Sequence, residues 1–302
     1  PMDYLIYVFN LLLLLFWIRL WSAPAKEFYF NPFLSGTVKF TDSVLAFLRP
    51  VLYMPEQAAA LVVMLFVILF KTILFARLNV PWNIRIGVYF QFAPAAAAGQ
   101  VTPTLLFSVL HVAVFLVRLW TVYLLVWLIT PPFRVTRATE ALAFFARPFS
   151  WLPKLAQPPV LLALHLLLAF ALARTGVLSV LGLPTEAPKP VAVSPFLEGP
   201  LTFQLLKTAW LAALSFADGL MLLTRGLFVL ILCNLGAAVF QSRGLLVICN
   251  EGVELLLGRF ARRGLGGMGF DFTPLIFFFV VDLMYNSICR GLFELIHSPF
   301  FK

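Results

Sequence analysis

The segment TDSVLAFLRPVLYMP at residues 41–55 recurs without gaps as TEALAFFARPFSWLP at residues 139–153. The two copies share a threonine followed by an acid, an Arg-Pro pair, an aromatic residue and a final proline. A third, weaker copy starts with NEGVELLLGR at residues 250–259 and lacks the Arg-Pro pair. Internal similarity at this scale indicates a structural unit that is used more than once.

Each copy reads as a short amphipathic helix. Thr41 and Thr139 suit the N-cap position, the acid that follows suits the positive end of the helix, and the proline after the arginine stops or kinks it. A helix of about two to three turns is too short to span a bilayer, so we expect it to lie in the headgroup plane. A plain loop helix without a partner role is the alternative. The expected interfacial anchors are Arg49, Pro50, Arg147, Pro148 and Arg259.

The composition around these segments indicates a membrane protein. Of the 302 residues, 62% are hydrophobic and 12% are charged, and the mean hydropathy is +0.98. Soluble domains carry about twice this share of charge, so a soluble enzyme, a disordered chain and a coiled coil are excluded. Unbroken apolar runs such as residues 11–15 and 277–281 favour helices over the alternating pattern of a β-barrel.

Six segments are long and apolar enough to be spanning helices. They cover residues 4–21, 58–76, 104–129, 159–180, 220–240 and 274–295. Two weaker segments, 86–101 and 201–217, could be short spans, re-entrant or interfacial. The chain therefore predicts an all-α integral membrane protein with about six transmembrane helices, and at most eight.

The repeats divide this single membrane domain, residues 1–302, into three units. Each unit has the order span, interfacial helix, span, and the units cover residues 4–76, 104–180 and 220–295. Residues 183–200 contain five prolines and are expected to form an extended loop. Because each unit returns the chain to its starting side, we expect the three interfacial helices on one face.

The net charge is +9, with 22 Lys and Arg residues spread between the apolar segments. This spread favours the positive-inside rule and contact with anionic lipid over binding of nucleic acid. We therefore expect the bilayer and other integral membrane proteins as partners. The expected location is a bacterial inner membrane or a plastid or mitochondrial inner membrane. The first apolar segment lacks a positive start and a cleavage site, so it is interpreted as a retained span.

Cofactor and enzyme motifs are missing from the sequence. The three cysteines lie far apart, and there is no CxxC, HExxH, P-loop or GxGxxG pattern. Ligation of haem or metal by His111 and His165 is a minor alternative, since both fall inside expected spans. We therefore expect a non-enzymatic protein without a metal or cofactor, apart from bound lipid.

Polar residues inside apolar spans are costly and usually face protein or water. The strongest candidates for an intramembrane pair are Arg118 and Asp282, and Asn286 shares a helix face with Asp282. Separate partners for each residue are the alternative. The remaining candidates are Lys71, His111, His165, Asp218 and Arg225.

Three motifs resemble the YggT family of small membrane proteins, whose plastid members are called YlmG-like. They are NPFL at 31–34, LRP at 48–50 and GMGFDFTP at 267–274. In the last motif Pro274 suits the first helical position, with Asp271 or Thr273 as the cap. The two halves of the family signature occur in different units, and this chain would have three units where the family usually has one or two.

The resemblance implies a non-enzymatic membrane protein, linked in bacteria to osmotic tolerance or division and in plastids to cytochrome complex maturation. We expect a structural subunit or an assembly and scaffold factor of a membrane protein complex. The alternative is a small-solute or ion transporter or channel involved in osmotic homeostasis, built where the repeats meet.

Overall fold

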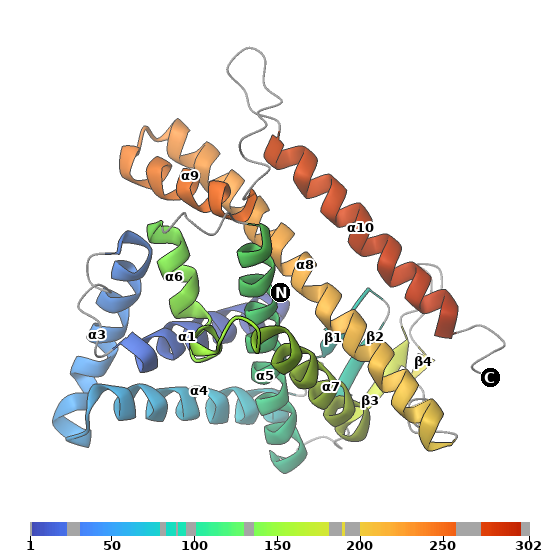
Figure 1. Cartoon of the computed structure of the whole chain (residues 1–302). Helices are drawn as coiled ribbons and strands as arrows, with labels where there is room; N and C mark the ends of the chain where they lie inside the picture. Colours follow the sequence, from blue (N-terminus) through green and yellow to red (C-terminus); the bar gives the residue numbers. More distant parts are fainter. Residues whose placement is uncertain are drawn as a thin grey trace.

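The computed structural model describes residues 2–22, 31–78, 83–88, 90–94, 101–129, 136–180, 189–190, 200–257 and 273–296. These residues form mainly helices, with one small sheet (Figure 1). The helices are α1 (Met2–Ser22), α3 (Pro32–Leu52), α4 (Glu56–Leu78), α5 (Val101–Ile129), α6 (Arg137–Phe145), α7 (Gln157–Thr175), α8 (Leu201–Val239), α9 (Arg243–Leu257) and α10 (Thr273–Ile296).

The helical membrane class predicted from composition is confirmed. Five helices, α4, α5, α7, α8 and α10, are long and apolar enough to cross a membrane, and α1 carries a shorter apolar segment, Val8–Trp21. Three of the helices, each preceded and followed by a more apolar helix, are amphipathic. They are α3, α6 and α9.

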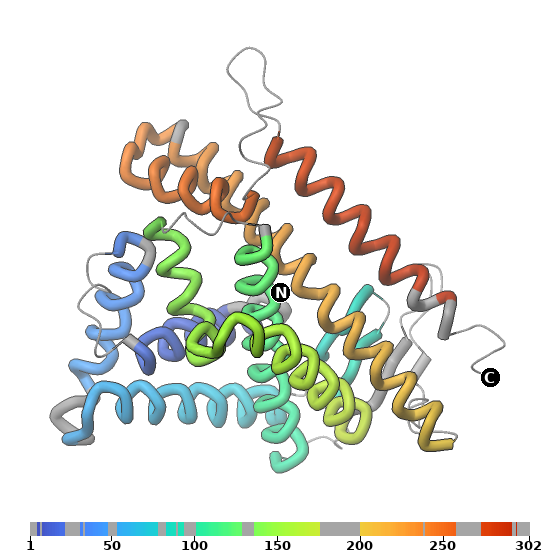
Figure 2. The backbone as a smooth tube through the Cα atoms, in the orientation of Figure 1, coloured from blue at the N-terminus to red at the C-terminus, as the bar shows by residue number. Residues whose placement is uncertain are grey.

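Helices α4, α7 and α8 pack directly against α5. In Figure 1, α1 and α4 lie side by side and run across α5, while α7 and α8 pass along its other side. The largest group of buried apolar side chains joins α5, α7, α8 and the sheet, and includes Phe107, Leu161 and Leu211. α10 packs against α8, and the two run in opposite directions (Figure 2).

A four-stranded antiparallel sheet lies beside α8, where the sequence predicts no strand. Its order follows the chain: β1 (Ile84–Ile86), β2 (Phe90–Pro94), β3 (Gly176–Val180) and β4 (Lys189–Pro190). The weak segment 86–101 therefore begins as part of a hairpin rather than as a span. The predicted span 159–180 also ends early, because α7 stops at Thr175 and the chain continues as β3.

The second weak segment, 201–217, is part of α8 and not a separate element. α8 is a single helix of 39 residues that continues through Asp218 and Gly219. At about 1.5 Å per residue it is about 58 Å long, well beyond the hydrocarbon core of a bilayer. The predicted separation of segment 201–217 from the span 220–240 is therefore wrong, and Asp218 lies in the middle of a helix.

The structure contains the amphipathic helices, but two of them do not start at the threonines that the sequence suggested. α3 begins at Pro32, so Thr41 lies inside it and donates to the Thr37 carbonyl at 2.8 Å. α6 is capped by Thr136 in a capping box, and Thr139 is the third helical residue of that box. The backbone of α3 also continues to Leu52, two residues past the Arg-Pro pair that should end it.

Candidate functional site

A buried carboxylate joins four elements near the centre of the molecule. Asp218 of α8 is 5% exposed and forms an ion pair with Arg118 of α5. One oxygen of Asp218 accepts from the hydroxyl of Tyr285 in α10 at 2.9 Å and from the backbone N–H of Gly87 at 3.0 Å. Arg118 also donates to the Arg85 carbonyl in β1. The charge pair therefore ties three spans to the hairpin.

Two glycines bring the backbones close enough for these contacts. A Cβ at Gly219 would lie 2.4 Å from Cγ2 of Thr121, one turn beyond Arg118 on α5, so α5 and α8 touch at this point. Gly87 has a φ of +64° in the turn between β1 and β2, a conformation that favours glycine. This turn directs its N–H at Asp218.

A second polar cluster lies one turn away along the same helices. His165 of α7 is fully buried; its Nε2 lies 2.9 Å from the hydroxyl of Thr121, and its Nδ1 lies 3.0 Å from the hydroxyl of Ser215. Thr121 donates its own hydrogen to the Val117 carbonyl at 2.9 Å. A neutral imidazole that donates from Nε2 and accepts at Nδ1 satisfies all these groups. Both ring nitrogens are thus occupied by protein groups, which speaks against ligation of haem or metal by this histidine.

A third cluster connects α4 to α5. The fully buried Lys71 lies with its Nζ 3.2 Å from Nδ1 of His111, and Thr72 donates to Ser108 at 2.8 Å. Arg118 lies seven residues beyond His111, so these polar residues follow one stripe of α5. The stripe meets α4 at one end and α8 at the other.

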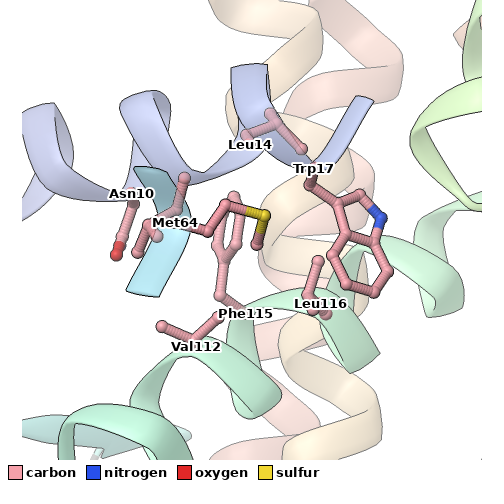
Figure 3. A pocket seen from close by; sticks show the side chains of 8 residues that line it. Asn10, Leu14, Trp17, Met64, Val112, Phe115 and Leu116 are labelled. Atoms are coloured by element: carbon pink, nitrogen blue, oxygen red, sulfur yellow. The ribbon is translucent and has the colours of Figure 1, made fainter. Parts of the chain in front are cut away.

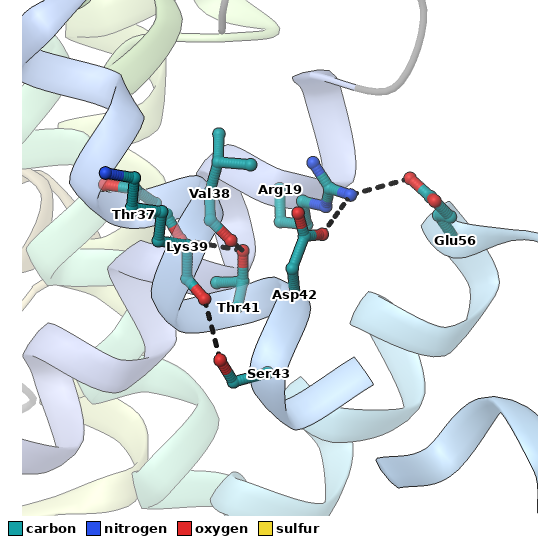
Figure 4. Close-up of polar contacts among 8 residues, drawn as sticks. All are labelled: Arg19, Thr37, Val38, Lys39, Thr41, Asp42, Ser43 and Glu56. Carbon is teal, nitrogen blue, oxygen red and sulfur yellow. Dashed lines mark hydrogen bonds and ion pairs between the residues drawn. The ribbon is translucent and has the colours of Figure 1, made fainter. Parts of the chain in front are cut away.

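An ion-pair cluster ties α1, α3 and α4 together (Figure 4). Arg19 of α1 is 1% exposed and contacts Asp42 of α3 at 2.6 Å and Glu56 of α4 at 2.7 Å. The two carboxylates are 41% and 38% exposed. The arginine is therefore buried behind two acids that face outward at the boundary of α1, α3 and α4.

The Arg-Pro pair at residues 147–148 makes contacts within the protein. Arg147 donates to the Trp21 carbonyl at 2.9 Å, and its guanidinium lies 3.7 Å from the ring centre of Phe144. The indole of Trp17 donates back to the Arg147 carbonyl at 2.9 Å. These contacts connect α1 to the end of α6, so Arg147 links two helices that lie far apart in the sequence.

The predicted pair of Arg118 with Asp282 is wrong. Arg118 pairs with Asp218, whereas Asp282 accepts a 3.0 Å hydrogen bond from Asn286 on its own helix. The outcome depends on the tilt and register of the helices, which place Asp218 and not Asp282 opposite α5.

The remaining predicted residues have mixed positions. α10 begins at Thr273, with Pro274 as its second residue, where the sequence places a helix start. Pro148 lies between α6 and the short 3-10 helix η1 (Phe149–Trp151). Arg49 and Pro50 lie on the backbone of α3, near its end. Arg259 and Asp271 lie outside the described residues.

A cavity between α1, α4 and α5 has a volume of about 10 Å³ (Figure 3). Leu13, Trp17, Met64 and Phe115 are among the side chains that line it, and Asn10 is the polar one. A cavity of this size holds about one water molecule. It is too small for a substrate or a cofactor.

These features define an integral membrane protein of the helical class, with interior polar groups that connect its helices. Comparison of the chain with protein-family models, with curated proteins and with solved structures finds no match.

Proposed function

We propose that the chain is a non-enzymatic structural subunit or assembly scaffold of an integral membrane protein complex. The observation that carries the proposal is a contrast between two parts of the molecule. Polar side chains in the interior are hydrogen-bonded to one another, whereas apolar side chains of α8 and α10 are exposed on the outside. Five polar side chains of α5, α7 and α8 bond to one another in the interior: Arg118 with Asp218, and His165 with Thr121 and Ser215. The outer surfaces of α8 and α10 are left free for other helices.

Burial differs strongly among the spans. In the most apolar windows of α4, α5 and α7, 39%, 44% and 33% of the residues are buried, against 22% in α8 and 17% in α10. Large side chains such as Phe279 (60% exposed) and Leu283 (68% exposed) project from α10. Lipid can cover such a surface, but it is also the surface on which membrane helices associate through close packing.

The order of elements supports the threefold repeat and the YggT resemblance as parts of this proposal. The second and third units each offer two long apolar helices and one amphipathic helix, and the first unit offers one long apolar helix, one amphipathic helix and the shorter apolar segment of α1. A bacterial or organellar inner membrane suits the positive charge and the family resemblance. The amphipathic helices would then rest against anionic headgroups on one face.

A native-gel and co-purification experiment tests the proposal. The tagged chain is extracted in mild detergent, and the size and composition of its complex are compared with those of two variants. Leu283→Asn places a polar group on the open face of α10. The matched control is Leu162→Asn, which changes a leucine of α7 whose side chain is 56% exposed. We expect the first variant to release partner proteins and the second to retain them. Equal retention by both variants would contradict the proposal.

The polar stripe of α5 favours a second candidate, a pathway for protons or small ions. His111 and Arg118 of α5, with Lys71 of α4 and His165 of α7 beside that helix, are ionisable groups inside spans, and such groups often mark ion pathways. Flux through liposomes that contain the purified chain alone tests this candidate. Flux that is lost in His165→Leu, while the protein stays folded, would favour it over the scaffold.

A further inference from the structure

We infer that the face of α8 and α10 that carries Arg225, Asp282 and Asn286 binds the same face of a second copy of this chain. The inference rests on the proposed function, because it names a partner for the open surface of these two helices. The observation behind it is that Arg225 and Asp282 carry opposite charges at nearly the same depth on an apolar outer surface.

Two contacts fix the register of α8 against α10. The hydroxyl of Tyr285 lies 2.9 Å from Asp218, and the rings of Phe278 and Phe228 lie 5.6 Å apart between centres. Residue numbers rise along α8 where they fall along α10, so the helices are antiparallel (Figure 2). Arg225 and Asp282 both lie between these two contacts, and therefore at nearly the same depth.

Arg225 and Asp282 do not form an ion pair of the kind that joins Arg118 to Asp218 in the interior. Arg225 is exposed, and among the described residues it has no hydrogen-bond or ion-pair partner. Asp282 is half-buried, and its hydrogen bond comes from the exposed Asn286 on the next turn. Val229 and Phe279, both more than half exposed, lie beside these groups. A charge in such apolar surroundings is costly unless a partner covers it.

The arrangement of charges points to a second copy. In a twofold interface both copies use the same surface. If one residue of the first copy contacts a different residue of the second copy, the same two residues also make contact with the copies exchanged. One cation and one anion at the same depth satisfy this rule, because Arg225 of each copy faces Asp282 of the other. Asn286 then adds a donor beside the carboxylate. Two ion pairs would form, and each copy would remove Arg225 and Asp282 from contact with lipid.

Mixing charge-reversed chains tests the inference. Arg225→Asp and Asp282→Arg are prepared with different tags, reconstituted in nanodiscs and assayed by co-purification of the two tags. Each variant alone brings like charges together, so we expect its dimer fraction to fall at least about tenfold. When the two variants are mixed, both ion pairs are restored in the heterodimer, and we expect association to return to the wild-type level.

Controls separate this result from loss of folding. Arg290 and Glu294 form an exposed ion pair at the end of α10, at 2.8 Å, and reversing either charge should leave the dimer intact. The milder changes Arg225→Gln and Asp282→Asn weaken the dimer without adding repulsion. Near-wild-type thermal stability shows that each variant is folded.

Three outcomes would overturn the inference. A wild-type chain that is monomeric in nanodiscs excludes the dimer. Failure of the mixed variants to associate, with rescue by the double reversal within one chain, would show that the two residues pair inside a single copy. Association that is unaffected by all four changes would place the interface elsewhere. Retention of other membrane proteins by a monomeric chain would leave the proposed function standing, whereas a dimer without other partners would contradict that function alone.

Discussion

The ion pair between Arg118 and Asp218 should be the most costly polar contact to break. Replacing Asp218 by Asn keeps the shape and leaves an oxygen that still accepts from Tyr285 and from the Gly87 N–H. The substitution therefore removes mainly the negative charge. Arg118 would remain inside the helix bundle with a positive charge and without its carboxylate.

The size of the effect follows from burial. Removing one partner of a fully buried pair costs about 3–5 kcal/mol. The Asp218 side chain is 6% exposed and that of Arg118 is 22% exposed, so partial screening reduces the cost. We expect Asp218→Asn to lower the free energy of unfolding by about 2–3 kcal/mol. Asp218→Leu should cost more, because the Tyr285 hydroxyl and the Gly87 N–H also lose an acceptor, at about 1–3 kcal/mol each.

A double-mutant cycle in mixed micelles measures the coupling. The free energy of unfolding is obtained from denaturant titration for Asp218→Asn, for Arg118→Met and for the double variant. We expect the double variant to lose less than the sum of the single losses, by about 1–3 kcal/mol. The same cycle between Arg118 and Asp282 should be additive. Additivity for Arg118 with Asp218, or a silent Asp218→Asn, would refute the buried ion pair.

Three further substitutions probe other contacts, each by thermal unfolding in detergent. Gly219→Ala should cost about 1–3 kcal/mol, because its Cβ meets a side chain of α5 at 2.4 Å, whereas Gly236→Ala, with nothing within 4 Å, should be neutral or stabilising. Equal effects at the two glycines would contradict a close crossing of α5 and α8. His165→Leu should cost about 1–3 kcal/mol, since it leaves a buried hydroxyl of α8 without its partner, and an unchanged melting temperature would argue against that cluster. Arg147→Lys should cost about 1–2 kcal/mol through loss of the planar contact with an aromatic ring and of the bond to the Trp21 carbonyl; a silent change would favour a headgroup anchor.

Hydropathy predicts the spans well because the length of an apolar run determines whether a helix can cross a bilayer. A run of about 20 apolar residues crosses a bilayer whatever its neighbours are, and five of the six expected segments lie mainly in helices of spanning length. The sixth, in α1, is a shorter apolar helix segment. The ends of the helices are predicted less well, since Thr136 and not Thr139 caps α6. Several threonines near a helix start can serve as the cap, and only the backbone geometry selects one.

The hairpin could have been predicted from its own pattern. Residues 84–86 read IRI and residues 90–92 read FQF, so apolar and polar residues alternate on both sides of Gly87. Alternation around a glycine is typical of a β-hairpin. The apolar character of residues 86–101 favoured a membrane segment instead. The strand that pairs with β2 is β3, which begins 82 residues after β2 ends, and such distant pairing is not visible in the local sequence pattern.

The partners of intramembrane charges could not be predicted, because apolar composition does not encode which face of a helix meets which neighbour. In the sequence, Asp218, Arg225 and Asp282 are equivalent polar residues within apolar segments. The structure divides them: Asp218 is enclosed by three helices and a turn, whereas Arg225 and Asp282 lie on the outer side of α8 and α10. Lipid gives little drive for helices to associate, so enclosed polar contacts and close glycine crossings hold such a bundle together. The enclosed charges therefore stabilise the single chain, and the outward ones are free to specify a partner. Neutralising an enclosed charge should lower the stability of the monomer, while neutralising an outward charge should change association and leave that stability nearly unchanged.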